Sequence, residues 1–132
     1  MTAVYVDTSA FLAVLDADDA NHARARQVWV QLLTSQTDLV CTSYVLVETH
    51  ALLQRRLGLD AVRVFHRDIL PLLHVEWVDE SLHQYAGQAV LTAGHRDLSL
   101  VDCAGFALMR LRGVTDAFAF DKHFAAQGFR LR

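Results

Sequence analysis

Residues 3–9 have the sequence Ala3-Val4-Tyr5-Val6-Asp7-Thr8-Ser9, an apolar run that ends in an acid and two hydroxyl residues. The run 3–6 predicts a short buried strand that ends at Asp7. Ser9 is a good N-cap residue, and the apolar residues that follow it predict a short helix. A buried strand that leads directly into a helix is the first unit of an α/β fold.

The same alternation of strand and helix continues along the chain. Further strands are predicted at residues 38–41, 74–78 and 117–120, and a last edge strand at 129–131. Capping residues predict where the intervening helices begin, at Asp18 and Asp19, Thr42 or Ser43, Asp60, Asp79 and Ser99. This order of elements predicts a mainly parallel sheet covered by helices.

Length and composition are those of one globular unit. The chain has 132 residues, of which 53% are hydrophobic and 20% charged, and this composition excludes a disordered chain. No linker or internal repeat divides the sequence, so we predict a single domain over residues 1–132. The high hydrophobic fraction suggests a surface covered by a partner, and we expect helices of the N-terminal half to form a homodimer contact.

The charge balance limits how the protein can bind nucleic acid. Twelve Lys and Arg residues against fifteen Asp and Glu residues give a net charge of −3. This excludes binding to polyanions by overall electrostatic attraction. Lys122 is the only lysine, so a phosphate group would have to be met by local arginines or through metal cations.

Cysteine usage and the absence of targeting signals predict a cytoplasmic protein. Cys41 and Cys103 lie in apolar runs without a CxxC pattern, which is typical of buried, reduced thiols. The N-terminus lacks a basic region followed by a long apolar stretch. No segment approaches the ~20 continuous apolar residues of a membrane span, so no membrane association is expected.

Four acids follow predicted strands or lie at the beginning of predicted helices. Asp7 and Asp121 come directly after the strands predicted at 3–6 and 117–120. Glu48 lies about one turn into the helix that follows the second strand, and Asp102 lies in the first turn of a helix capped by Ser99. Ligands bind at the carboxyl edge of open α/β sheets, so we expect the four carboxylates to meet there.

Carboxylates that converge in apolar surroundings need compensating charge. Each acid is preceded by apolar residues, and four such groups would repel one another unless cations lay between them. Hard oxygen ligands without a His or Cys cluster favour Mg²⁺ or Mn²⁺ over Zn²⁺. One or two such ions could lower the pKa of a bound water and hold it in line with a phosphodiester.

The chain resembles the PIN-domain nucleases and, within them, the VapC-type toxins of bacterial VapBC toxin–antitoxin pairs. The resemblance covers the whole chain and has four motifs in order: Val4-Tyr5-Val6-Asp7-Thr8-Ser9, Thr42-Ser43-Tyr44-Val45-Leu46-Val47-Glu48, Leu98-Ser99-Leu100-Val101-Asp102 and Ala119-Phe120-Asp121-Lys122-His123-Phe124. Each motif alone is weak, whereas all four in this order form a strong combined signal.

The resemblance implies a fold, an activity and a set of site residues. It implies a single-domain, three-layer α/β/α sandwich and a Mg²⁺- or Mn²⁺-dependent endoribonuclease that cleaves RNA, for example a tRNA or another structured RNA. It also implies a homodimer and a small cognate VapB-type antitoxin that inserts into the site. The implied metal-binding and catalytic residues are Asp7, Glu48, Asp102 and Asp121, supported by the hydroxyl groups of Thr8 and Ser99.

Two other functions fit parts of the sequence. A phosphoacceptor receiver domain of similar length would use a strand-end aspartate and a lysine, roles that Asp79 and Lys122 could fill. That hypothesis leaves Glu48 and Asp102 without a role. A non-catalytic binding module on a PIN-like fold is the second alternative, since a fold does not determine a function.

The seven histidines are scattered and show no paired metal-binding spacing. Most of them are therefore expected to be exposed or satisfied by local hydrogen bonds. His123 stands two residues after Asp121, where it can either lie near the site or belong to a local helical turn.

Overall fold

Five parallel strands form one sheet within residues 2–132, the part of the chain that the computed structural model describes. The strands stand in the order β3-β2-β1-β4-β5. Their bounds are Ala3–Val6 for β1, Asp38–Thr42 for β2, Leu73–Glu76 for β3, Asp116–Phe118 for β4 and Arg130–Leu131 for β5. The central strand β1 is paired on both sides and buried, which explains its uninterrupted apolar sequence.

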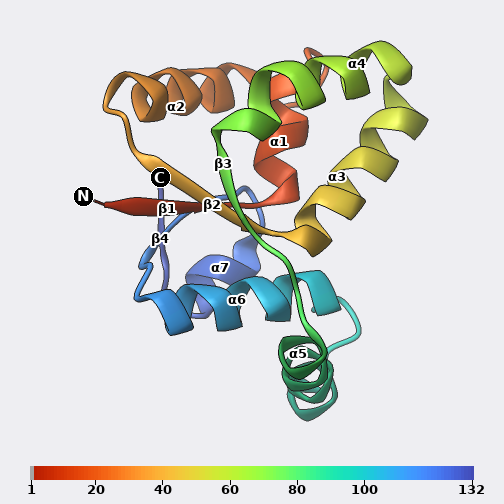
Figure 1. Cartoon of the computed structure of the whole chain (residues 1–132), viewed down its shortest axis with the longest axis vertical. Helices are drawn as coiled ribbons and strands as arrows, with labels where there is room; N and C mark the ends of the chain where they lie inside the picture. The colour runs from red at the N-terminus through yellow and green to blue at the C-terminus, as the bar shows by residue number, and fades with distance from the viewer. Residues whose placement is uncertain (1) are drawn as a thin grey trace.

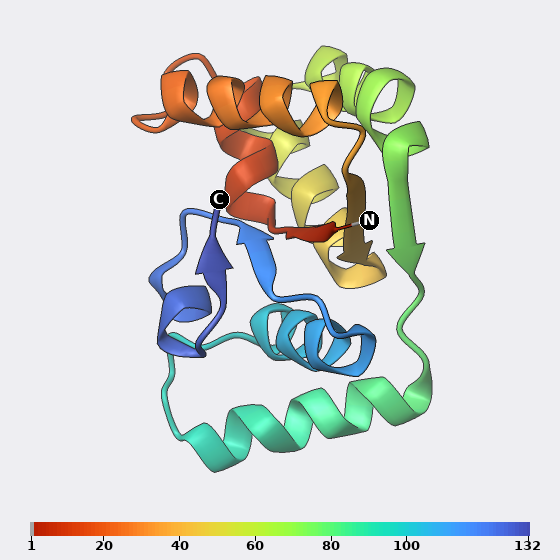
Figure 2. The same ribbon diagram turned by 90° about the vertical axis from the view of Figure 1, so that its left-hand side faces the viewer.

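Helices cover both faces of this sheet (Figure 1). The helices α1 to α4 lie on one face, and α6 and α7 lie on the other, so the predicted three-layer α/β/α sandwich with a parallel sheet is confirmed. Their bounds are Thr8–Leu15 for α1, His22–Thr34 for α2, Ser43–Arg56 for α3, Leu59–Val64 for α4, Glu80–Ala93 for α5, Leu100–Arg112 for α6 and Lys122–Ala126 for α7. Figure 2 shows that α5 packs outside α6, away from the sheet.

A π-helical turn, Phe65–Ile69, and a short 3₁₀ helix, Leu70–Leu72, connect α4 to β3. No helix in residues 2–132 combines the length and the apolar character needed to cross a membrane.

The strand order reverses between β1 and β4. The chain adds β2 and β3 on one side of β1 and then places β4 and β5 on the other side. The backbone N–H of Asp7 donates to the carbonyl of Phe118 at 3.0 Å, so the carboxyl ends of β1 and β4 lie side by side. In open α/β sheets, the crevice at such a reversal is the usual ligand site.

Capping residues placed several helices correctly. Asp79 caps α5, and Gly94 ends it with a φ of 70°. Ser99 caps α6 in a capping box with Asp102, and the helix ends at Gly113 as expected. Local hydrogen bonds fix these ends, which is why sequence alone could predict them.

Other predicted boundaries were wrong. The N-cap of α1 is Asp7, whose carboxylate accepts from the backbone N–H of Ser9. The helix expected after Asp18 begins only at His22, because Asp19 caps a turn by accepting from Asn21 N at 2.8 Å.

Two further boundaries also differ. The N-cap of α4 is Gly58 and not Asp60, which lies in the first turn. The strand predicted at 117–120 ends at Phe118, so Asp121 lies three residues beyond it, at the N-cap of α7.

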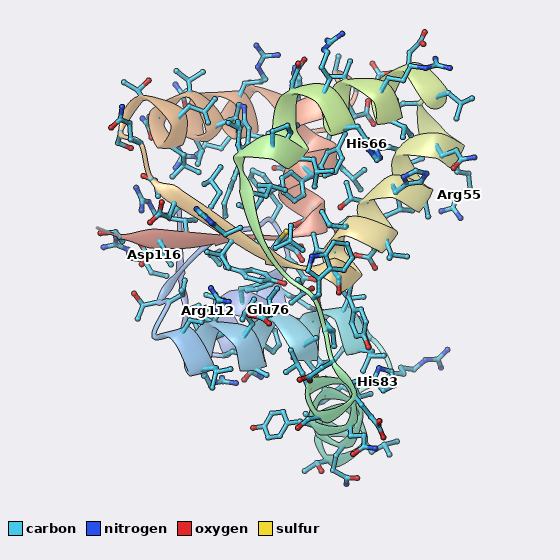
Figure 3. All side chains as sticks on the ribbon, in the orientation of Figure 1. Arg55, His66, Glu76, His83, Arg112 and Asp116 are labelled. Carbon is cyan, nitrogen blue, oxygen red and sulfur yellow. The ribbon has the colours of Figure 1, made fainter. Side chains whose placement is uncertain are left out.

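Ion pairs hold the outer strands in place (Figure 3). Asp116 at the beginning of β4 accepts from Arg130 at 2.6 Å and from Arg132 at 3.1 Å, which fixes the short edge strand β5. At the opposite side of the sheet, Arg112 at the end of α6 pairs with Glu76 at the end of β3. These contacts stabilise edges that have few backbone hydrogen bonds of their own.

Gly105 allows α6 to lie directly on the central strand. A Cβ at this position would stand 2.5 Å from the hydroxyl oxygen and 2.8 Å from Cζ of Tyr5, which is fully buried. We therefore expect Gly105→Ala to destabilise the fold by about 1–3 kcal/mol, because the added Cβ would force the buried Tyr5 side chain or the helix to shift. Thermal unfolding of Gly105→Ala and of the wild type would measure this effect.

Gly87→Ala is the matched control, since Gly87 also lies within a helix and a Cβ there meets nothing within 4 Å. This change should stabilise the protein by up to about 1 kcal/mol through helix propensity. Equal unfolding temperatures for the two variants would contradict the close approach of α6 to β1.

Candidate active site

The four acids singled out in the sequence line one cleft of about 280 Å³ at the carboxyl edge of the sheet. Asp7 comes from the end of β1, Glu48 from α3, Asp102 from the first turn of α6 and Asp121 from the segment after β4. Thr8 and Ser99 line the same cleft. All six residues predicted for the site therefore lie together, although they come from four separate parts of the chain.

Asp7 is a buried carboxylate. Its residue is 5% exposed, and its Oδ2 accepts from the backbone N–H of Ser9 at 3.1 Å and from the Ser9 hydroxyl at 2.6 Å. Burial, together with the charges of Asp102 and Asp121, raises the pKa of Asp7 to about 6 despite these hydrogen bonds. The negative charge on Asp7 is therefore unfavourable unless a cation is present.

Asp102 is held by the beginning of its own helix. Its backbone N–H donates to the Ser99 hydroxyl at 3.0 Å, and its Oδ2 accepts from the backbone N–H of Ser99 at 3.2 Å. Burial raises the pKa of Asp102, and the charge of Asp121 acts in the same direction. Ser99 thus positions the carboxylate of Asp102.

Glu48 is half-buried on α3, and the next residue, Thr49, forms a hydrogen bond to α1. The Thr49 hydroxyl donates to the Thr8 hydroxyl at 3.3 Å, and both residues are buried. Because Thr8 follows Asp7 and Thr49 follows Glu48, this contact fixes two of the acids relative to each other. It gives Thr8 a supporting place beside the acids.

The Ser9 hydroxyl connects two strand ends. It donates to Asp7 Oδ2 and accepts from the backbone N–H of Phe120 at 2.9 Å, across 111 residues of sequence. Phe120 directly precedes Asp121, so the hydroxyl sets the spacing between two carboxylates. The sequence indicated only a helix cap at Ser9.

Asp97 and His123 also belong to this region. Asp97 lines the cleft, and its Oδ2 lies 3.7 Å from Nε2 of His123. Ligand atoms of His123, Asp102 and Asp121 lie within 4.8 Å of one another. Asp97 stands in a turn-rich segment without periodicity, so its place in the site could not be predicted, and its only signal in the sequence is its position two residues before Ser99.

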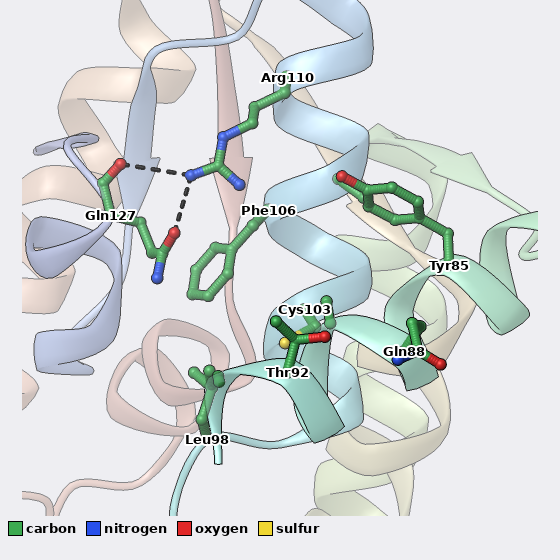
Figure 4. A pocket seen from close by; sticks show the side chains of 11 residues that line it. Tyr85, Gln88, Thr92, Leu98, Cys103, Phe106, Arg110 and Gln127 are labelled. Carbon is green, nitrogen blue, oxygen red and sulfur yellow. Dashed lines mark hydrogen bonds between the residues drawn. The ribbon is translucent and has the colours of Figure 1, made fainter. Parts of the chain in front are cut away.

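A groove between α5 and α6 has a different lining. Figure 4 shows a groove of about 420 Å³ between α5 and α6, lined mainly by apolar side chains such as Leu98 and Phe106. Arg110 beside it donates to the side chain of Gln127 at 2.8 Å.

The placement of Asp79 argues against a receiver domain. Asp79 lines a separate cleft and accepts from the backbone N–H of Leu82 at 2.8 Å as the cap of α5. It is thus apart from Asp7 and serves as a helix cap in place of the strand-end acid that a receiver domain would use.

Comparison with known proteins gives consistent matches over the full fold. A model of the PIN domain matches residues 4–130. The 23S rRNA-specific endonuclease VapC20 of Mycobacterium tuberculosis is 38% identical over 128 residues, which cover 96% of this chain and 95% of the relative. The crystal structure of VapC20, described as a sarcin–ricin loop cleaving toxin, matches with a TM-score of 0.82 and 34% identity over 96% of each chain.

A more distant likeness shows the fold alone. The DNA-bound VapBC of Salmonella typhimurium has a TM-score of 0.67 at 17% identity and covers 100% of this chain and 98% of its own. Together with the parallel sheet and the extent of the family match, these findings establish the family: this chain belongs to the PIN domain family.

Proposed function

We propose that this protein is a metal-dependent endoribonuclease that acts as the toxin of a toxin–antitoxin pair. The observation that carries the proposal is the cleft itself, in which four carboxylates from four separate segments meet. The 38% identity to an rRNA-specific endonuclease over nearly the whole chain supports RNA hydrolysis as the reaction.

The donor set of the cleft fits a hard divalent cation. Its potential ligands are mainly carboxylate oxygens, and burial raises the pKa of both Asp7 and Asp102. Such groups are stabilised when a cation replaces the water that they have lost. Mg²⁺ or Mn²⁺ would supply Lewis-acid chemistry, which lowers the pKa of a water and stabilises negative charge on a phosphate.

We assign the chain's own residues to binding and positioning. Asp7, Glu48, Asp102 and Asp121 would bind the metal and direct the attacking water, since all four line the cleft. Ser99 holds the Asp102 carboxylate, as described above. Thr8 holds α1 against α3 through Thr49. Rigid support of this kind keeps the ligands close to their bound geometry before the metal arrives.

Ribosomal RNA is the substrate class that the relatives favour. VapC20 is described as specific for 23S rRNA, and this chain aligns with 95% of that relative. The net charge of −3 makes recognition by shape and local contacts more favourable than by bulk attraction. The folded ribosome or its 23S rRNA is therefore the first substrate to test.

We infer that the protein binds two kinds of protein partner, a second copy of the chain and a VapB-type antitoxin. Exposed apolar residues support this inference. Val47 and Trp77 are 69% and 71% exposed and lie with Leu46 along a groove of about 450 Å³. Val47 lines this groove and Glu48 lines the acidic cleft, so α3 contributes residues to both surfaces. Exposed apolar side chains grouped in this way are typical of interaction surfaces.

Metal removal tests the proposed activity. The purified, antitoxin-free protein is expected to cleave ribosomal RNA into discrete fragments with Mg²⁺ or Mn²⁺, and EDTA should stop the reaction. Primer extension on 23S rRNA would locate the cut, with a tRNA pool as a second substrate. Discrete cleavage that continues in EDTA would contradict the metal-dependent mechanism. Absence of cleavage from every RNA under all metals would favour the non-catalytic module.

A further inference from the structure

We propose that His123 is a further metal ligand of this cleft, which binds the divalent cation through Nε2 together with Asp102 and Asp121. The inference rests on the proposed function, because it concerns the same cation. The family resemblance implied carboxylate ligands alone, so an imidazole nitrogen would change which metal this chain prefers.

The beginning of α7 fixes His123 beside an acid. Asp121 is the N-cap of this helix, and its Oδ1 accepts from the backbone N–H of His123 at 2.8 Å. The imidazole is 19% exposed and is therefore mostly buried. Its Nε2 is 4.0 Å from Asp121 Oδ1 and therefore points toward the acids that line the cleft.

The spacing suits a shared ion. Ligand atoms of Asp102, Asp121 and His123 lie within 4.8 Å of one another. Two ligands on opposite sides of one ion, with bonds of about 2.1–2.3 Å, lie roughly 4.2–4.6 Å apart. Small side-chain rotations would therefore bring the three groups onto one cation.

The ring nitrogen is not occupied by a nearby carboxylate. Nε2 lies 3.7 Å from Asp97 Oδ2 and 4.0 Å from Asp121 Oδ1, and both distances are too long for a direct hydrogen bond. The Asp97 side chain is 60% exposed and can turn. It offers a further oxygen within reach of the same ion, either directly or through a water.

An imidazole ligand has a consequence for metal preference. Mg²⁺ prefers oxygen ligands alone, whereas transition metals accept imidazole nitrogen readily. A site in which an imidazole joins the carboxylates should therefore bind Mn²⁺ more tightly than Mg²⁺. Removal of the imidazole should reduce this difference.

Pulsed electron paramagnetic resonance with Mn²⁺ as the probe tests the ligand directly. The full-length protein with less than one equivalent of Mn²⁺ is expected to show the ¹⁴N coupling of a bound imidazole, and His123→Gln should lose it. Calorimetric titration should show Mn²⁺ binding weakened about tenfold or more in the variant, with a smaller change for Mg²⁺. His74→Gln is the matched control, because His74 lies on β3 with a side chain that is 64% exposed.

The outcomes separate this inference from the proposed function. A wild-type Mn²⁺ spectrum without ¹⁴N coupling would overturn the role of His123 and leave the carboxylates as the metal site. The same conclusion would follow if His123→Gln kept both the coupling and the affinity. Failure of the wild-type protein to bind either metal would overturn both proposals. A wild-type spectrum without coupling overturns the role of His123 whether or not the variant folds, and the loss of coupling in His123→Gln but not in His74→Gln assigns an observed coupling to His123.

Discussion

Asp102→Asn is expected to lower the rate of RNA cleavage by about 10²–10³-fold while the protein stays folded. The substitution removes a negative charge from the cleft and leaves an oxygen that can still accept from the backbone N–H of Ser99. The backbone N–H at position 102 still donates to the Ser99 hydroxyl, so the cap of α6 is retained. Cleavage of 23S rRNA at saturating Mn²⁺, with circular dichroism as the folding check, would measure the effect.

Asp60→Asn is the matched control for this loss. Asp60 lies in the first turn of α4, its side chain is 96% exposed, and it pairs with Arg63, whose side chain is 69% exposed. Asp60 does not line the acidic cleft, and an exposed ion pair contributes little to stability. The same chemical change there should therefore leave RNA cleavage at the wild-type rate. If Asp102→Asn cleaved RNA as fast as Asp60→Asn, Asp102 would be only a helix-capping residue.

Asp7→Asn should abolish metal-dependent cleavage and yet stabilise the metal-free protein. Burial raises the pKa of Asp7 from 3.8 to about 6, so its charged form is unfavourable in the folded state at pH 7. A neutral amide removes this cost and can still accept from Ser9, which corresponds to a gain of about 1–3 kcal/mol. Thermal unfolding in EDTA would measure it as a rise of several degrees in Tm.

The pH dependence has a definite sign. The folded protein takes up a proton at Asp7 near pH 6, whereas an unfolded chain does so near pH 4. Because the folded state binds more protons at Asp7 in this window, the contribution of Asp7 to the stability of the metal-free wild type should rise as the pH falls from 7 to about 4. Asp7→Asn should lack this contribution, and the difference between the two curves isolates Asp7.

Added metal should make the wild type more stable than Asp7→Asn, the reverse of the order expected without metal. Mn²⁺ is expected to raise the Tm of the wild type by binding the folded state, and to raise that of Asp7→Asn far less. A metal-free variant less stable than wild type at pH 7 would contradict the unfavourable burial of this carboxylate. Asp60→Asn again serves as the control with no expected change.

Sequence alone determined the features that depend on neighbours along the chain. The apolar run 3–6 required a buried strand, and Ser99 with Asp102 required a helix start, because a cap satisfies its own first turn. The four acids were recognised because each stands near the end of a strand or the beginning of a helix, where an α/β fold binds its ligands.

Tertiary structure alone decided what long-range pairing brings together. The order β3-β2-β1-β4-β5 places the reversal between β1 and β4, and no local pattern fixes which strands become neighbours. The bridge from the Ser9 hydroxyl to the Phe120 backbone spans 111 residues and exists only because those two strands are adjacent.

The same pairing determines the electrostatics of the cleft. Burial, which raises the pKa of Asp7, depends on the packing of the entire sheet and its helices. The approach of Asp97 to His123 likewise requires α7 to begin beside the segment that precedes α6. Local propensity thus defined the acids and their elements, whereas the distances that give those acids their chemistry were set by the packing of distant segments.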